Sequence, residues 1–316
     1  MWIEDLRCVS CQKTLHFTSK TLTCSNCVRK FTIERDIPRF VDFEYYTHNF
    51  GLQWKRFAST QLDSANGMNR SARRFQKETN MNVADLEDLV VLDAGCGAGR
   101  FLELLKGDYS KKFGVDMSLA VEIAKENNPK VNIIQADISK LPFSDNYFDV
   151  VYSIGVIHHT SEPKSVLREL TRILRDGGIL SLCFYENYRW YTKLYSKYLI
   201  RPITKRLPSR LLMRIIEISS YVWFPLTSLL FKLPLSIGKM FQFIIPVANY
   251  VSEDYSSKKS RKEEAILDTF DMLAPKYDKP LSRREIFQWL NSFGVTFQLL
   301  EVHSKKGALK FRIIKH

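Results

Sequence analysis

The stretch Val91-Leu92-Asp93-Ala94-Gly95-Cys96-Gly97-Ala98-Gly99-Arg100 decides the fold. Its first residues are apolar and predict a buried strand, and its three alternating glycines predict a tight turn that opens a helix near Gly99. Bare backbone lets a ligand approach main-chain N–H groups, and a helix N-terminus adds partial positive charge. A dinucleotide-binding turn requires its third glycine at position 100, where this chain has arginine, so the pattern disfavours NAD and FAD.

Strand and helix patterns alternate after this turn, which predicts a parallel α/β sheet. Asp116 ends the second strand, where it can accept hydrogen bonds from ribose hydroxyls, and Asp137 follows the third, where it can accept from an adenine amino group. Ser118 is expected to cap the next helix, and Gly177-Gly178 to end the helix before strand five. The expected elements are strands 112–116, 131–136, 148–153 and 179–184 and helices 119–126 and 166–174.

The order and spacing of these motifs resemble the class I S-adenosylmethionine-dependent methyltransferases, in particular the branch that includes ubiquinone and menaquinone biosynthesis enzymes. The resemblance covers residues 90–184 and implies a Rossmann-like, seven-stranded α/β sheet whose last strand is antiparallel. It implies S-adenosylmethionine as cofactor, with the following contacts: Asp93, Gly95 and Gly97 around the methionine part, Asp116 at the ribose, Met117 on the adenine, Asp137 and Ile138 at the adenine edge, and Cys96 and Ile154 nearby. From the residues alone, the alternative is an α/β domain whose strand-end carboxylates are solvated turn residues.

Four of the six cysteines form two pairs, Cys8-x-x-Cys11 and Cys24-x-x-Cys27, separated by twelve residues that can form a hairpin. Four thiolates suit a closed zinc site, which is structural because the protein fills every coordination position. Two disulfides are the alternative, and they require an oxidising compartment. Residues 6–41 are also similar to the zinc-ribbon family typified by a tRNA methyltransferase activator subunit, although Asp36 stands where that family often has glycine.

Length and composition predict more than one domain, since 316 residues with 45% hydrophobic content exceed one core. The acidic start Trp2-Ile3-Glu4-Asp5 lacks the layout of a secretory signal, which predicts a cytoplasmic protein. Ser282 and Glu285 predict a capping box ahead of a helix at 286–293. The expected domains are a zinc ribbon (1–44), cap helices with the cofactor-binding core (45–184), a helical insertion after strand five (185–280), and a final helix with an antiparallel hairpin at 295–302 and 308–314 (281–316).

The net charge of +13 is concentrated in residues 189–262, which hold fourteen Lys or Arg against three Asp or Glu. The same segment is rich in aromatic and aliphatic residues, yet its longest uncharged run, Ile218 to Phe231, is too short to span a bilayer. Basic helices with apolar faces predict a substrate lid or a peripheral contact with an anionic membrane at its inner face. The alternative is a helical subdomain whose apolar faces pack on one another.

Candidate substrate and catalytic residues flank this core. Gln53 and Trp54 lie in a segment that resembles zinc-ribbon-fused bacterial methyltransferases from glycan and natural-product clusters, and Tyr277 lies in a second such segment. We expect these three to contact substrate, with simple packing as the alternative. His158 and His159 follow strand four and are candidate general bases for a hydroxyl acceptor, unless they are structural turn residues.

The sequence therefore predicts an S-adenosylmethionine-dependent methyltransferase that acts on a small molecule, a glycan or a lipid-linked intermediate. In such a reaction the protein chiefly aligns the acceptor with the methyl carbon and excludes water. An rRNA or tRNA methyltransferase whose zinc ribbon docks RNA is the main alternative, because the chain is basic. A noncatalytic module that activates a partner is the third reading, and the intact cofactor motifs disfavour it.

Overall fold

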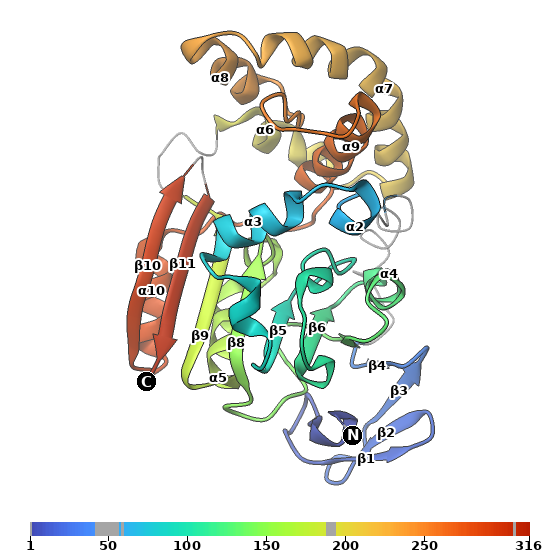
Figure 1. The fold of residues 1–316 in the computed structure, drawn as a ribbon, viewed down its shortest axis with the longest axis vertical. Coiled ribbons are helices and arrows are strands. Elements are labelled where there is room, and N and C mark those ends of the chain that lie inside the picture. Colours follow the sequence, from blue (N-terminus) through green and yellow to red (C-terminus); the bar gives the residue numbers. More distant parts are fainter. Residues whose placement is uncertain (1, 42–56, 58–59, 188–193, 306–307) are drawn as a thin grey trace. The chain divides into compact units, whose positions relative to one another are not determined.

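The computed structural model describes residues 2–41, 57, 60–187, 194–305 and 308–316 (Figure 1). The chain divides into two compact units. An α/β unit draws on residues 1–54, 71–188 and 277–316, and a helical unit draws on residues 55–70 and 189–276. The residues of each unit mainly contact other residues of the same unit.

A mixed sheet runs through the described part of the α/β unit, in the order β1-β2-β3-β4-β7-β6-β5-β8-β9-β11-β10 (Figure 1). Five of its strands pair in parallel: β5 (Val91–Ala94), β6 (Lys112–Asp116), β7 (Asn132–Gln135), β8 (Phe148–Ile154) and β9 (Leu174–Tyr185). β11 (Ala308–Lys315) lies antiparallel between β9 and β10 (Phe297–Lys305). These seven strands confirm the predicted Rossmann-like sheet with an antiparallel last strand.

Four further strands extend this sheet, a feature that the sequence did not predict. They are β1 (Leu15–Thr18), β2 (Thr21–Cys24), β3 (Lys30–Glu34) and β4 (Ile37–Arg39). β4 pairs in parallel with β7, placing Arg39 opposite Gln135. The Arg39 side chain is buried, and its guanidinium donates to Gln135 Oε1 at 2.6 Å and to Glu122 at 3.0 Å. The amino-terminal segment is therefore joined to the sheet edge by backbone pairing and by a buried arginine.

The helices of the α/β unit are α3 (Arg70–Thr79), α4 (Ala120–Asn127), α5 (Pro163–Ile173) and α10 (Arg283–Ser292). In α10 the predicted capping box is present, since Ser282 Oγ accepts from the Glu285 N–H at 3.3 Å and the Glu285 carboxylate accepts from the Ser282 N–H at 2.7 Å. α5 buries Val166, Leu167 and Leu170 at helical spacing. Both helices thus form where periodicity and capping predict them.

Two expected helix boundaries are wrong. No α-helix begins near Gly99, and only a 3-10 turn, η3 (Leu102–Leu104), follows the glycines. The chain leaves helical conformation at once, because Leu105 is extended (ψ 138°) and Gly107 has a φ of +82°. α5 ends at Ile173 rather than at Gly177-Gly178, because β9 begins pairing at Leu174.

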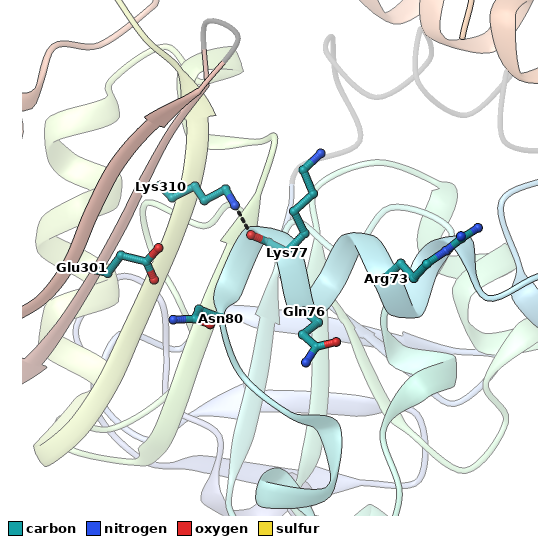
Figure 2. Close-up of a pocket in the computed structure, with 6 residues that line it drawn as sticks. All are labelled: Arg73, Gln76, Lys77, Asn80, Glu301 and Lys310. Atoms are coloured by element: carbon teal, nitrogen blue, oxygen red, sulfur yellow. Dashed lines mark hydrogen bonds between the residues drawn. The ribbon is translucent and has the colours of Figure 1, made fainter. Parts of the chain in front are cut away.

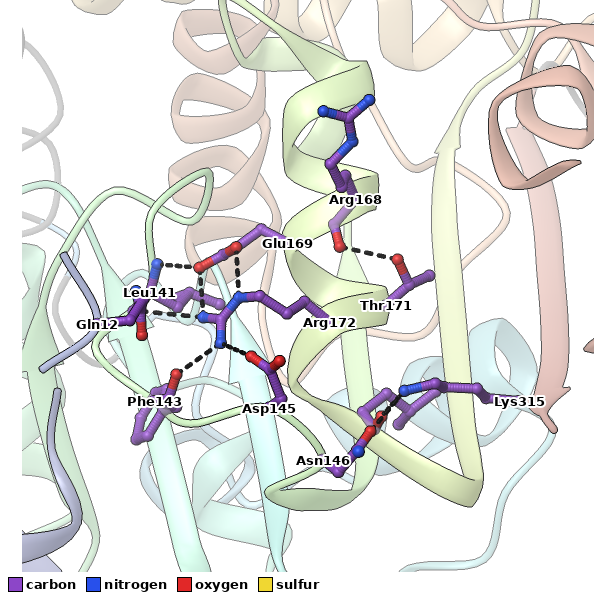
Figure 3. Close-up of polar contacts among 11 residues, drawn as sticks. Gln12, Leu141, Phe143, Asp145, Asn146, Arg168, Glu169, Thr171, Arg172 and Lys315 are labelled. Atoms are coloured by element: carbon purple, nitrogen blue, oxygen red, sulfur yellow. Dashed lines mark hydrogen bonds and ion pairs between the residues drawn. The ribbon is translucent and has the colours of Figure 1, made fainter. Parts of the chain in front are cut away.

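Arg172 of α5 holds the loop that precedes β8 (Figure 3). Its guanidinium is paired with Glu169 and with Asp145, each at 2.7 Å. Glu169 also accepts a hydrogen bond from the Leu141 N–H at 2.6 Å. Gln12 of the amino-terminal segment donates to the Leu141 carbonyl at 3.4 Å, so this loop contacts both the helix and the segment that precedes β1.

The helical unit contains α2 (Asp63–Asn66), α6 (Ser196–Thr204), α7 (Ser209–Leu230), α8 (Leu235–Ile244) and α9 (Lys258–Leu273). α7 packs along α9, where Arg261 lies over the Phe224 ring at 5.0 Å and donates to Ser228 at 2.9 Å. Arg70 pairs with Glu253 at 2.6 Å and with the buried Glu264. Among the described helices, none combines the length and apolar character that crossing a membrane requires.

Candidate cofactor site and metal centre

The glycine loop after β5 is held against β6 by its own backbone. The N–H groups of Gly95 and Cys96 both donate to the Val115 carbonyl, at 2.7 and 3.0 Å. A Cβ on Gly95 would lie 2.5 Å from Val156, and one on Gly99 would lie 2.3 Å from Asn128. Local packing and positive φ thus favour glycine at both positions independently of any ligand.

Asp116, at the end of β6, organises this loop. Its Oδ2 accepts from the Gly97 N–H at 3.0 Å, and its Oδ1 accepts from the Ser118 N–H and Oγ at 2.8 and 2.7 Å. Burial raises the pKa of Asp116, and these donors oppose the rise. Each carboxylate oxygen has two lone pairs, so Oδ2 can accept a second hydrogen bond. The sequence predicted a ligand contact here but not the bond to Gly97.

Asp93, in β5, is the most deeply buried acid of the site, with 2% of its surface exposed. Its Oδ2 makes no hydrogen bond of ordinary geometry within the described part of the chain, although the Tyr152 hydroxyl, which is likewise buried, interacts with this carboxyl. Burial raises the pKa of Asp93 well above its ordinary value, with Tyr152 opposing the rise and the Asp116 charge adding to it. A buried acceptor of this kind is costly unless a donor binds it. The carboxyl is therefore suited to a ligand that carries an N–H or ammonium group.

The remaining predicted cofactor residues lie at the carboxyl ends of neighbouring strands. Asp137 follows β7, is half-buried and accepts from the Ser139 N–H at 2.8 Å. Met117 is half-buried after β6, Ile138 is buried after β7, and Ile154 ends β8. Because β5, β6, β7 and β8 run parallel to one another within the sheet, their carboxyl ends lie at the same edge. Cys96 differs, since its side chain is buried within the core cluster.

The two candidate histidines have different surroundings in the turn after β8, η5 (Ile157–His159). His158 is 1% exposed, its ring packs on Tyr185 with centroids 4.2 Å apart, and its Nδ1 accepts from the Tyr185 N–H at 3.4 Å. His159 is half-buried, and its Nδ1 lies 3.1 Å from the Tyr277 carbonyl oxygen. A carbonyl only accepts, so this bond places the proton on Nδ1 of His159 and the lone pair on Nε2.

The predicted substrate residues are only partly described. Gln53 and Trp54 lie outside the described residues. Tyr277 is half-buried, and the contact that it makes with His159 uses its backbone carbonyl rather than its phenol. The structure thus brings one predicted substrate residue next to one predicted base.

The four paired cysteines converge as the sequence predicts, on the hairpin formed by β1 and β2. Their Sγ atoms all lie within 4.8 Å of one another, with Cys8–Cys27 at 3.6 Å and Cys11–Cys24 at 3.5 Å. These separations exceed the ~2.05 Å of a disulfide, and they approach the ~3.8 Å edge of a tetrahedron with Zn–S bonds of ~2.3 Å. The N–H groups of Asn26 and Cys27 lie 3.4 Å from Cys24 Sγ and lower the pKa of that thiol to about 6. The cluster fits a closed tetrahedral metal site.

A further pocket of about 440 Å³, which the sequence reasoning missed, lies between α3 and the β10–β11 hairpin (Figure 2). Its lining includes three cations, Arg73, Lys77 and Lys310, and one acid, Glu301, and Lys310 Nζ donates to the Lys77 carbonyl. The clustered basic residues of α3 are a sequence pattern that could have indicated it, but only the fold brings Lys310 beside them.

Residues 92–182 match the methyltransferase domain family. Similar proteins include a tRNA U34 carboxymethyltransferase of Pseudoalteromonas atlantica (33% identity, 32% of this chain and 33% of the relative) and a demethylmenaquinone methyltransferase of Renibacterium salmoninarum (29% identity, 42% and 56%). A sterol 24-C-methyltransferase of Gibberella zeae is 30% identical over 38% of this chain and 33% of its own length. Among solved structures, an S-adenosylmethionine-dependent methyltransferase of Mesorhizobium loti aligns with a TM-score of 0.41 at 14% identity, covering 73% of this chain and 93% of that one.

Residues 92–182 therefore form a class I S-adenosylmethionine-dependent methyltransferase domain, which confirms the prediction made from the motifs. The alignments cover between a third and 56% of the length of these curated relatives. The residues fit the cofactor, because the buried Asp93 carboxyl, beside the Tyr152 hydroxyl, retains lone pairs that can accept from the ammonium group of its methionine part. The relatives carry names of enzymes for tRNA, a quinone and a sterol, so they share the methyltransferase domain and differ in acceptor.

Proposed function

We propose that the whole chain is an S-adenosylmethionine-dependent methyltransferase whose acceptor is an amphipathic small molecule or a glycan carried on a lipid. The cofactor assignment rests on the buried Asp93 Oδ2, which lies beside the glycine loop of the matched domain. Two observations support an apolar acceptor: the quinone and sterol relatives, and the many apolar side chains on the surface of the helical unit.

Three acids at strand ends would hold the cofactor. When bound, the cofactor supplies a methyl group on a sulfonium sulfur, and this sulfur is a good leaving group. Asp93 would accept from the ammonium, Asp116 from a ribose hydroxyl through the second lone pair of Oδ2, and Asp137 from the adenine amino group. Asp116 would also keep the loop in place through Gly97, so it has both a binding and a positioning role. The protein would contribute alignment and exclusion of water rather than covalent chemistry.

His159 is our candidate for the general base when the acceptor atom is a hydroxyl oxygen. Its hydrogen bond to the Tyr277 carbonyl fixes the tautomer in which Nε2 is basic. His158 is packed between His159 and Tyr185 and is assigned a structural role that supports the neighbouring ring. We further propose that the four-cysteine cluster binds structural zinc.

Titration calorimetry with S-adenosylmethionine tests the cofactor assignment. The unmodified protein should bind, Asp93→Asn should bind weakly, and Asp88→Asn, an exposed acid outside the site, should bind as the unmodified protein does. A protein that binds no S-adenosylmethionine would favour the noncatalytic activator instead.

The acceptor is tested by incubating the protein with methyl-labelled cofactor and separate lipid, small-metabolite and RNA fractions. We expect label in the lipid or metabolite fraction. An RNA methyltransferase is the second candidate, favoured by the tRNA-modifying relatives and by the basic pocket of Figure 2. Label confined to RNA would contradict our acceptor class and leave the cofactor assignment intact.

A further inference from the structure

The helical unit presents an unusual concentration of apolar side chains to solvent. Among the described residues, fifteen of the nineteen large apolar side chains that are exposed lie between positions 194 and 244. Monomeric soluble proteins rarely expose apolar surface in such a concentration unless it contacts something. This concentration of exposed apolar side chains indicates that the segment has a binding surface.

α7 carries the clearest case, because it is apolar on two opposite faces. One face is buried within the protein and includes Leu212, Ile216 and Phe224. On the other side, positions spaced by three or four residues are all apolar and exposed, at 46 to 71% of their surface: Leu211, Ile215, Ile218, Val222, Leu226 and Leu229. An ordinary amphipathic helix has polar residues on the side opposite its core.

The neighbouring helices repeat the pattern on a smaller scale. In α8, Ile237, Met240 and Ile244 are spaced by three and four residues and are about half exposed. In α6, Leu199 and Ile203 are spaced by four residues and are 66 and 67% exposed. Three successive helices therefore each leave an apolar stripe without a partner among the described residues.

The charges that accompany these stripes are almost all positive. Between positions 194 and 244 the exposed charged side chains are Lys205, Arg206, Arg210, Arg214, Lys232 and Lys239. Glu217 is the single acid of the same segment, and it is half-buried. Arg210 and Arg214 lie on α7 itself, beside Leu211 and Ile215 in sequence.

We propose that α6, α7 and α8 dock this protein on an anionic lipid surface, with their apolar stripes among the acyl chains and their cations at the headgroups. Interfacial helices have this combination of apolar face and flanking Lys and Arg, and they lie in the membrane plane rather than cross it. A second copy of the chain is a poorer occupant, because a parallel pairing of α7 would bring Arg210 and Arg214 of both copies together, and an antiparallel pairing would place them beside residues 218–230, which carry no acid. The docking goes beyond the methyl transfer proposed above and does not require it.

Vesicle flotation tests the docking, using the full chain without S-adenosylmethionine. We expect binding to vesicles of equal parts phosphatidylglycerol and phosphatidylcholine, and little binding to phosphatidylcholine alone. Ile218→Asp should weaken binding about tenfold or more, since it places a charge in the apolar stripe. The matched control is Val28→Asp, which changes an equally exposed apolar residue of the α/β unit and should bind as the unmodified protein does.

Two double variants test whether the cations of α7 bind the anionic headgroups. Arg210→Glu with Arg214→Glu should lower binding to the anionic vesicles about tenfold or more. Lys258→Glu with Lys259→Glu changes the net charge equally at exposed positions of α9 and should have a small effect. If both double variants lost vesicle binding equally, net charge alone would explain the effect. That result would overturn the assignment of lipid binding to α6, α7 and α8.

Two results would overturn the docking outright. One is the absence of flotation with anionic vesicles, and the other is a dimer in sedimentation velocity that Ile218→Asp dissociates while vesicles are not bound. Calorimetry with S-adenosylmethionine is run on the same samples. A protein that binds the cofactor but no vesicle contradicts the docking alone, and one that binds vesicles but no cofactor contradicts the proposed function alone.

Discussion

α5 and α7 bury similar apolar faces and differ on the opposite side. α5 covers the sheet with Val166, Leu167 and Leu170, and its outward positions include Lys164 and Arg168, which are exposed. α7 buries a comparable face and then repeats the apolar pattern on its exposed side. α5 is therefore complete within its own unit, whereas α7 has the surface of a helix that contacts something outside the protein.

The same difference extends to the units that contain these helices. The α/β unit buries an aromatic cluster, in which Phe113 meets Phe143 and Phe148 edge to face with ring centroids 5.6 and 5.5 Å apart. The helical unit places Tyr221 and Val222 of α7 at 77 and 71% exposure. Burial in the first unit serves the fold and the cofactor edge, and exposure in the second leaves apolar area available for an interface.

Removal of the metal is expected to give the largest effect and to confine it to the α/β unit. Cys24→Ser removes one of four ligands, and structural zinc contributes on the order of 10 kcal/mol of folding free energy in small domains. Zinc content measured by mass spectrometry should fall from one equivalent towards zero. Hydrogen exchange should accelerate in β1 to β4 and at β7, which pairs with β4, and should stay unchanged in α7 and α9.

Ser25→Ala, in the same turn, is the control for this experiment and should retain zinc. Equal acceleration of exchange in α9 would contradict the separation into two units. A zinc-free protein with unchanged exchange in β2 would contradict the metal site.

Two neighbouring isoleucines of α7 measure the difference between its faces. Ile216 is 4% exposed, so Ile216→Ala should lower the free energy of unfolding by about 2–4 kcal/mol. Ile218 is 71% exposed, so Ile218→Ala should change it by less than about 0.5 kcal/mol. Urea denaturation followed by circular dichroism gives both values. Similar losses in the two variants would mean that the exposed stripe is covered by the protein itself.

Asp93→Asn should separate binding from stability within the α/β unit. The dissociation constant for S-adenosylmethionine should rise by about 10- to 100-fold, as for the loss of one charge-assisted hydrogen bond. The pKa of Asp93 is raised in the folded state, so above its ordinary value of 3.8 the folded protein holds a proton that the unfolded chain has released. Stability is then lost as the pH rises through this window, and asparagine removes that loss.

Calorimetric titration and urea denaturation at several pH values between about 4 and 8, from just above the ordinary pKa of a carboxyl to beyond neutrality, check the two parts. The variant should be at least as stable as the unmodified protein at neutral pH. A large loss of stability together with unchanged cofactor affinity would assign Asp93 to the fold alone.

Local patterns predicted the parallel strands well, and pairings between distant segments were not predictable. β6 has the expected bounds because an apolar run ends in Asp116, and α10 forms because Ser282 and Glu285 cap it. The pairing of β4 with β7 is a tertiary contact between short strands, and no periodicity encodes it. The same holds for the bond from Gly97 to Asp116, which depends on how the loop folds over β6.

The helical unit shows where composition is insufficient. The sequence indicated that residues 189–262 are basic and apolar, but it left open whether the apolar faces pack on one another. The structure shows that both occur on α7, with Phe224 buried and Leu226 half exposed two positions away. Helical spacing alone could not distinguish these faces, because apolar residues occupy both.

Arg172→Gln is expected to give the smallest measurable effect and tests how the polar side of α5 contributes (Figure 3). The Arg172 side chain is 21% exposed and that of its partner Asp145 is 72% exposed, so that pair contributes little, while the bonds to Glu169 and to the Phe143 carbonyl are better shielded. We expect a loss of about 1–2 kcal/mol in urea denaturation. Arg168→Gln, one turn earlier, should cost less than about 0.5 kcal/mol, because Arg168 is exposed. If neither variant changed the free energy of unfolding, the polar side chains on the outer side of α5 would contribute no stability. α5 and α7 would then differ only in how many apolar side chains they expose.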